Sequence, residues 1–254
     1  RKDWDAIPSR VEIGTDRLLG LFARAQVKAT FFVLGWIAER HPAMIRRIVE
    51  SGHELASHGV QHDRADRQTR AEFRADVRRS KKMLEDIGGV AVKGYRAATF
   101  SIGASNLWTH DVLAEEGFAY SSSIYPIAHD LYGMPDAPRA PFRAGGKGLL
   151  EVPLTTLRGF GRNWPSSGGG YFRLLPYAVS RWSLGRVNAR EGRAAVFYLH
   201  PWEIDPNQPR VKGLSLKSGF RHYLNLARME RRLERLLGDF AWGAMDEVFL
   251  GVRR

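Results

Sequence analysis

Residues 29–34, Ala-Thr-Phe-Phe-Val-Leu, are the stretch of sequence that decides the fold. A short, uninterrupted apolar run of this kind is typical of a parallel strand that is buried on both faces. Before it, apolar residues recur at helical spacing between Leu18 and Ala25, which predicts a helix with one buried stripe. After it, Pro42 opens a second predicted helix and Gly52 ends it. A strand between two helices indicates an α/β fold, in which helices cover a parallel sheet.

The same alternation of strand and helix continues along the chain. A capping box formed by Thr69 and Glu72 opens a helix whose apolar positions step by three and four residues. Another amphipathic helix is predicted near the end of the sequence. Further strands are predicted at residues 54–57, in a segment that leads into Tyr95-Arg96, and at residues 118–125, 149–152 and 195–199. We therefore expect one α/β domain over residues 1–254, with a barrel-like sheet and its chemistry at the carboxyl ends of the strands.

Composition excludes several classes of protein. The chain has 254 residues, of which 44% are hydrophobic, and this is enough apolar material for one sizeable core. It contains no apolar run of about 18 residues, so no membrane span is predicted. It also contains no cysteine, which excludes a disulfide scaffold and leaves histidines and carboxylates as the available metal ligands.

The formal charge of +12 raises nucleic acid or another anionic polymer as a partner. The positive charge is scattered and consists of 31 arginines against 8 lysines, with no run of five basic residues. This distribution favours solvated helix faces over a nucleic-acid surface. We therefore predict that nucleic acid is not a partner of the chain.

Polar residues that could carry chemistry follow three of the predicted strands. His58 and His62 are four residues apart and can bind one cation from a helix face or a tight loop, although such pairs also occur without a metal. Arg96 at a strand end is either a surface ion pair or an anchor for a carboxylate. His200 at another strand end suits a general acid or base, and the alternative is a core-edge histidine bonded to the backbone. His110 is expected at the surface of a helix.

Four short motifs, in this order, resemble one known family. The segment Ser57-His58-Gly59-Val60-Gln61-His62, after Gly52-His53-Glu54, is similar to the metal-binding motif of the polysaccharide deacetylases. These are the NodB-like carbohydrate esterases of family four. Residues 29–35 (ATFFVLG) are similar to the strand before that motif. Tyr95-Arg96-Ala97-Ala98 resembles the family's Arg-x-Pro motif, and Leu199-His200 resembles its final Leu-His motif.

Three longer strings resemble one subgroup of this family. They are GGGYFRLLP at 168–176, FYLHPWEIDPNQPR at 197–210 and FRHYLNLARME at 220–230. The subgroup comprises the deacetylases associated with exosortase-linked exopolysaccharide loci. The resemblance covers nearly the whole chain.

The resemblance implies a distorted (β/α) barrel and a hydrolase that removes N-acetyl groups from a polysaccharide with a divalent metal ion, zinc first among the candidates. His58 and His62 would be metal ligands, and His200 would protonate the leaving amine. Arg96 would orient a catalytic aspartate, and the N–H of Thr99 would help to hold the oxyanion. The implied partner is an N-acetylated polysaccharide, and Trp202 is expected to contact it.

The sequence departs from the family in its first motif, which is rich in aspartate. Neither the catalytic base nor the aspartate ligand of the metal has a counterpart in this chain. Asp16 fits the first turn of a helix, where carboxylates are favoured, and Asp3 and Asp5 have no strand-like context. We therefore expect the barrel to lack its first strand, and the chain as given to be impaired as an enzyme.

Two further departures concern the other motifs. Ala98 stands where the family has proline, which puts the role of the nearby Thr99 in question. No Asp-x-x-Asp-Trp motif is found, so Glu203 or Asp205 is the candidate to orient His200.

Two other functions stay open at this point. The chain could be a non-catalytic glycan-binding relative that kept the fold, or a weaker binder of anionic polymers. The combination of His58, His62, Arg96 and His200 favours the enzyme, because a binding module has no need of all four. The location of the protein is left as either cytoplasmic or associated with the cell envelope.

Overall fold

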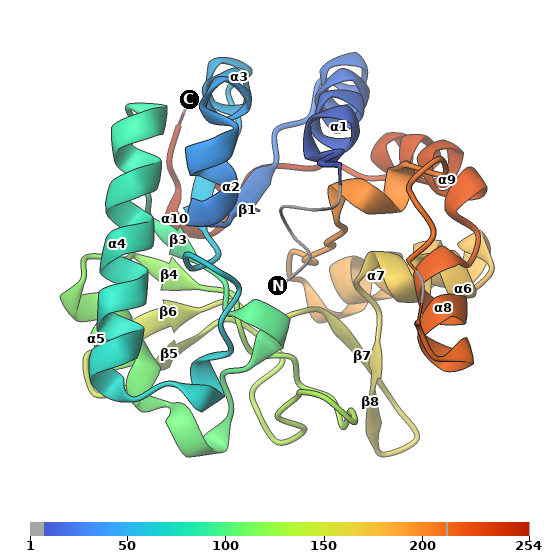
Figure 1. Cartoon of the computed structure of the whole chain (residues 1–254). Helices are drawn as coiled ribbons and strands as arrows, with labels where there is room; N and C mark the ends of the chain where they lie inside the picture. Colours follow the sequence, from blue (N-terminus) through green and yellow to red (C-terminus); the bar gives the residue numbers. More distant parts are fainter. Residues whose placement is uncertain (1–7, 212, 254) are drawn as a thin grey trace.

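The computed structural model describes residues 8–211 and 213–253 (Figure 1). The strands are β1 (Thr30–Val33), β2 (Glu54–Ser57), β3 (Gly94–Tyr95), β4 (Tyr120–Ser121), β5 (Phe142–Ala144), β6 (Leu149–Glu151), β7 (Thr156–Gly159) and β8 (Arg162–Pro165). The helices are α1 (Val11–Ala25), α2 (Gly35–Arg40), α3 (Pro42–Glu50), α4 (Arg70–Gly88), α5 (Trp108–Glu115), α6 (Gly169–Leu174), α7 (Tyr177–Glu191), α8 (Leu216–Tyr223), α9 (Leu226–Asp239) and α10 (Met245–Leu250).

The central sheet has the strand order β1-β2-β3-β4-β6-β5. Its strands are parallel except β5, which pairs antiparallel with β6 at one edge. β7 and β8 form a separate antiparallel hairpin. The predicted α/β architecture is confirmed. The described strands form an open sheet, which is compatible with the predicted distorted barrel but is not a closed one.

β1 lies at the other edge of this sheet, so it is less buried than the sequence predicts, which is burial on both faces. Three of its four residues are half-buried and Val33 is buried. Residues 195–199 were expected to form a strand, and the structure assigns them none. One cavity is lined by residues 29–33 on one side and by residues 194–200 on another. Both segments line this cavity, and no described backbone hydrogen bond joins residues 195–199 to a neighbouring strand, so the strand prediction is wrong.

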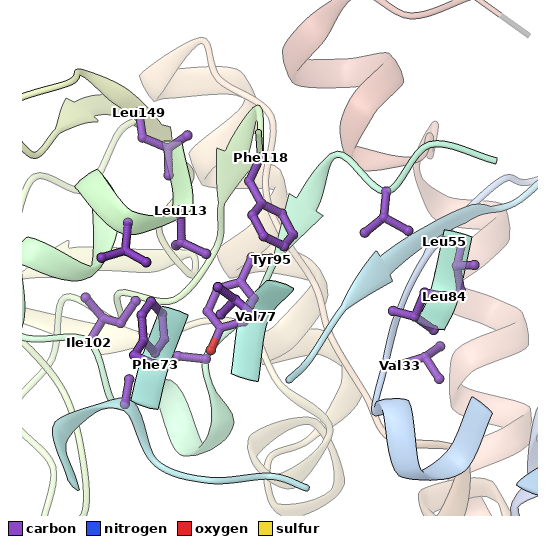
Figure 2. Packing of buried hydrophobic residues seen from close by; sticks show 14 of the residues in the cluster. Val33, Leu55, Phe73, Val77, Leu84, Tyr95, Ile102, Leu113, Phe118 and Leu149 are labelled. Atoms are coloured by element: carbon purple, nitrogen blue, oxygen red, sulfur yellow. The ribbon is translucent and has the colours of Figure 1, made fainter. Parts of the chain in front are cut away.

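The main apolar core lies between the sheet and α4, which runs along one side of it (Figure 1). α4 begins with the predicted capping box, in which the Thr69 side chain accepts from the Glu72 amide and Glu72 accepts from the Thr69 amide. Its buried stripe includes Phe73 and Val77, which point toward Tyr95 of β3 (Figure 2). The rings of Phe73 and Tyr95 meet edge to face, 5.7 Å apart. This packing fixes the strand that Arg96 follows.

A second apolar cluster joins the two ends of the chain. It contains Leu18 and Phe22 of α1, Leu184 of α7, and Met229 and Leu233 of α9. Phe197 and Leu199 of the extended segment pack against this cluster. Val196 and Tyr198 of the same segment pack against a third cluster that contains Tyr120 of β4, so the segment that leads into His200 is held by helices and by the sheet.

The parallel strands carry the candidate residues to one edge of the sheet. His58 follows β2 directly, Arg96 follows β3, and Ser122 follows β4. Parallel strands place their carboxyl ends at the same edge, so these three residues meet there. Within the described part of the chain, every helix is too short or too polar to cross a bilayer.

Candidate active site

The loop after β2 turns back on itself and brings two imidazoles together. Gly59 has a φ of +79°, and a Cβ at this position would lie 2.8 Å from Oδ2 of Asp76. The Val60 amide donates to Oδ1 of the same Asp76 at 3.0 Å. His62 also has a positive φ, of 59°. In this loop the rings of His58 and His62 lie 5.1 Å apart between centroids, so the two side chains are neighbours, as a shared cation requires.

A hydrogen bond determines which ring nitrogen of His58 carries the proton. Its Nδ1 lies 2.7 Å from the backbone oxygen of Arg96, and a carbonyl oxygen only accepts, so Nδ1 carries the proton. Burial, followed by the nearby His62, lowers the pKa of His58 to about 3. The ring is therefore neutral at ordinary pH, and its Nε2 keeps the lone pair that a metal ion needs.

No third protein ligand accompanies the pair in the part of the chain that the structure describes. No group of three histidine or carboxylate side chains there is arranged to hold a metal ion. Asp16 lies on α1, where its carboxylate pairs with Arg47 at 3.1 Å. Asp3 and Asp5 lie outside the described residues. The two imidazoles fit a divalent metal ion by their chemistry, and they supply part of a ligand set.

Arg96 is a buried cation, and the surface ion pair considered from sequence is excluded. Its Nε donates to the Ser122 carbonyl at 2.9 Å and its Nη2 to the Ser122 hydroxyl at 2.8 Å. The guanidinium lies 4.2 Å from the centroid of the Phe32 ring. Among the described residues, no carboxylate lies within ion-pair distance of it. Burial accordingly lowers the pKa of Arg96 to about 10, which leaves it charged at neutral pH and suited to binding an anion.

The turn after Arg96 is strained at the predicted oxyanion residue. Thr99 has φ 55° and ψ 28°, and Phe100 has φ 48°. A left-handed backbone at a β-branched residue costs on the order of 1–3 kcal/mol. The turn is closed by hydrogen bonds from the Phe100 amide to Ala97 and from the Ser101 amide to Ala98. The Thr99 amide takes no part in these two bonds, and Thr99 lines the cavity.

His200 enters the site from the extended segment and is held by a carboxylate. Its Nδ1 lies 3.3 Å from Oε2 of Glu203, and its backbone amide donates to the same oxygen at 2.8 Å. Asp205 points elsewhere and pairs with Arg10 at 2.6 Å. Of the two carboxylates that the sequence left open, Glu203 is therefore the one that contacts His200.

Trp202 lies beside the cavity rather than in its wall. Its ring stacks on His222 with centroids 4.2 Å apart, and on His200 with centroids 5.6 Å apart. Imidazoles therefore cover its ring, which explains why it is absent from the cavity lining. The expected contact of Trp202 with a sugar stays a prediction, and in the structure its ring stacks on that of His200.

The other site residues predicted from sequence line one cavity of about 940 Å³. His58, His62, Arg96, Thr99 and His200 all line it. Away from these polar groups the walls are mostly apolar. Paired imidazoles, a buried cation, a strained turn and a half-exposed imidazole form a set suited to hydrolysis of an acyl group with a metal ion.

Sequence reasoning missed two features of the interior. His110, expected at the surface, is fully buried and lies 3.0 Å from the carboxylate of Glu151. It is buried because α5 packs between α4 and β6. Arg173 was not singled out either, although it is among the largest fully buried side chains and pairs with Glu203. Its place in the string 168–176, three residues after a run of glycines, was the available signal.

The fold and these side chains define a class: α/β proteins with an imidazole-lined cavity at the carboxyl ends of parallel strands. The profile of the polysaccharide deacetylase family matches residues 4–120. A second profile, "Domain of unknown function (DUF3473)", matches residues 122–250. The chain therefore carries a polysaccharide deacetylase domain followed by a DUF3473 region. The two matches meet at β4, so both regions contribute strands to one sheet.

Curated relatives resemble the first half of the chain. A peptidoglycan deacetylase of Helicobacter pylori is 32% identical over 113 residues, which cover 44% of this chain and 38% of that protein. A chitooligosaccharide deacetylase of Bradyrhizobium sp. is 31% identical over 111 residues, which cover 44% of this chain and 48% of that protein. The matches therefore span less than half of either relative.

Solved structures resemble nearly the whole chain. A Mycobacterium smegmatis protein assigned to the polysaccharide deacetylases has a TM-score of 0.63 and 25% identity, covering 94% of this chain and 77% of that one. A family 4 pseudoenzyme from Bacillus anthracis has a TM-score of 0.52 and 14% identity, covering 95% of this chain and 62% of that one. The second likeness shows the fold alone.

Proposed function

We propose that this chain is the catalytic region of a metal-dependent deacetylase that hydrolyses the N-acetyl groups of a polysaccharide. The observation that carries the proposal is the meeting of His58, His62, Arg96, Thr99 and His200 in one cavity, although they come from separate segments. Relatives named as peptidoglycan and chitooligosaccharide deacetylases support the class of substrate. The strings shared with the exopolysaccharide-linked subgroup favour an N-acetylated exopolysaccharide.

His58 and His62 would hold a divalent ion, and zinc suits two neutral imidazoles best. When bound, such an ion polarises the amide carbonyl and makes its water a better nucleophile. The hydrogen bond from Nδ1 of His58 to the Arg96 carbonyl fixes the ring, so that Nε2 is the nitrogen that donates to the ion.

The other side chains would act on charges and protons. Arg96 would hold a carboxylate, because a buried guanidinium without an acidic partner attracts one strongly. The Thr99 amide would donate to the developing oxyanion. His200, as an imidazolium, would give a proton to the leaving amine while Glu203 holds its Nδ1.

The test is release of acetate from chitooligosaccharides during long incubations with and without added Zn²⁺ or Co²⁺. We expect metal-stimulated release that is lost in His58→Ala. The control is His41→Ala, which removes a histidine that pairs with Glu12 outside the cavity. Release that is independent of metal, or equal in His58→Ala and the native chain, contradicts the proposal.

The alternative function is glycan binding without catalysis. The observation in its favour is the lack, among the described residues, of a carboxylate that completes the histidine pair. Isothermal titration with chitopentaose separates the two functions. Binding that is unaffected by metal, together with no acetate release under any metal, supports the binding protein.

A further inference from the structure

Three segments that are distant in sequence meet beneath His200. They are the start of α6, the turn that begins at His200, and the end of α8. Glycines allow the first two to approach closely: a Cβ at Gly169 would lie 2.2 Å from Oε2 of Glu203, and a Cβ at Gly168 would lie 2.7 Å from the Tyr198 ring. A side chain at Gly169 would push α6 away from the carboxylate, and one at Gly168 would collide with Tyr198.

Arg173 of α6 connects Glu203 to the end of α8. Its Nε donates to Oε1 of Glu203 at 2.9 Å, and both side chains are 2% exposed. Its Nη1 donates to the carbonyls of His222 at 3.0 Å and Leu224 at 2.7 Å, and its Nη2 to that of Arg221 at 3.1 Å. A cation is favoured at the carbonyl end of a helix, so α8 and Glu203 hold the same guanidinium.

Glu203 is shared between two partners, one on each oxygen. Oε1 faces Arg173, and Oε2 faces both the backbone amide and Nδ1 of His200. Burial opposes its ionisation, but the hydrogen bonds from His200 and the charge of Arg173 hold the pKa of Glu203 below its ordinary value. An ionised carboxylate at Nδ1 of His200 keeps the proton on that nitrogen.

We infer that Arg173 is a positioning residue for His200: it fixes the Glu203 carboxylate, which holds the His200 ring in the Nδ1–H form and leaves Nε2 to exchange protons. The inference deepens the proposed function and rests on the role of His200 given there. Arg173 lies outside the cavity wall, so it acts through Glu203 and not on a substrate.

The experiment reads the His200 ring directly and does not depend on turnover. The chain is labelled with ¹⁵N-histidine, and the two ring nitrogens are observed by long-range ¹H–¹⁵N correlation at neutral pH. The His200→Gln variant assigns the His200 signals. In the native chain we expect the neutral ring to be mainly in the Nδ1–H form.

Arg173→Met removes the guanidinium and keeps an unbranched side chain. We expect the ratio of Nδ1–H to Nε2–H forms to fall by about tenfold, as the loss of a hydrogen bond to a well-fixed charge implies. The matched control is Arg232→Met. Arg232 donates to the carbonyls of Phe172, Arg173 and Leu175 in the same region, and it makes no described contact with Glu203.

The inference is overturned if Arg173→Met leaves the His200 ratio within twofold of the native value, or changes it no more than Arg232→Met does. If Arg173→Met does not fold, the Arg173→Lys variant is used instead. Lysine keeps a positive charge beside Glu203 but loses the three hydrogen bonds that the guanidinium donates to carbonyls at the end of α8. The same ratio is then expected to fall by a smaller factor, and an unchanged ratio overturns the inference. Failure of acetate release with a native-like His200 signal would count against the proposed function alone.

Discussion

The two sides of the cavity handle buried charge in opposite ways. On the side of the sheet, Arg96 is buried against Phe32 and Ser122, and no described carboxylate forms an ion pair with it. On the side of the helices, Glu203 and Arg173 balance each other at 2.9 Å and are almost fully enclosed. The pKa of Arg96 is lowered by burial, whereas Glu203 stays ionised because its partners outweigh its burial. The helical side therefore holds a paired buried charge, whereas the sheet side holds a buried cation without an ion-pair partner among the described residues.

The largest effect expected from this difference concerns catalysis. If the sheet side provides no base, acetate release from chitooligosaccharides should be about 10²–10⁴-fold slower than for a deacetylase that has one, since that is the usual contribution of a general base. The Bradyrhizobium chitooligosaccharide deacetylase, measured alongside with the same metal, is the reference. Comparable rates would show that some other carboxylate of this chain serves the site.

The second effect concerns stability. Glu203→Gln leaves the Arg173 charge buried without its partner, so the free energy of unfolding should fall by about 3–5 kcal/mol. Arg96→Met removes a buried charge that already lacks a carboxylate, and we expect a change within about 1 kcal/mol. Urea unfolding of both variants tests the contrast. Equal losses would mean that Arg96 is as well compensated as Glu203.

The third effect is a dependence on pH. The pKa of His58 is about 3 in the folded chain against an ordinary 6.5. Between these values the unfolded chain binds a proton that the folded chain does not, so stability is full above pH 6.5 and falls as the pH decreases. The contribution of this residue is roughly 1.4 kcal/mol per pH unit.

The His58→Gln variant isolates that contribution. Its free energy of unfolding, measured by urea titration between pH 6 and 4, should fall less steeply than that of the native chain by the amount given above. Identical slopes would show that the His58 ring accepts a proton without leaving its place in the fold.

The smallest effect expected is relief of backbone strain on the sheet side. Thr99→Gly should raise the free energy of unfolding by about 1 kcal/mol, because glycine adopts a φ of 55° without steric conflict. Gln26→Gly is the control, since Gln26 also has a positive φ, of 54°, at the end of α1. A loss of stability in Thr99→Gly alone would mean that contacts of the threonine side chain outweigh its strain.

The sheet side was the more predictable from sequence. Each of its residues follows a strand, and parallel strands deliver their ends to one edge, so order along the chain was enough to group His58, His62 and Arg96. The helical side depends on contacts between segments separated by about 30 residues, such as Arg173 with Glu203. Neither periodicity nor spacing reports that kind of pairing. The strand predicted at 195–199 failed for a related reason, because its apolar residues pack against two separate clusters without any described backbone hydrogen bond to a neighbouring strand.

Gly169 has a consequence for how substitutions that reduce the activity of this protein are interpreted. It does not line the cavity, yet a single methyl group there would collide with the carboxylate that holds His200. In a screen for lost activity, we expect Gly169→Ala to rank with substitutions of His200 and Glu203. Substitutions that impair the proposed reaction would therefore include one at a glycine that has no side chain to take part in it.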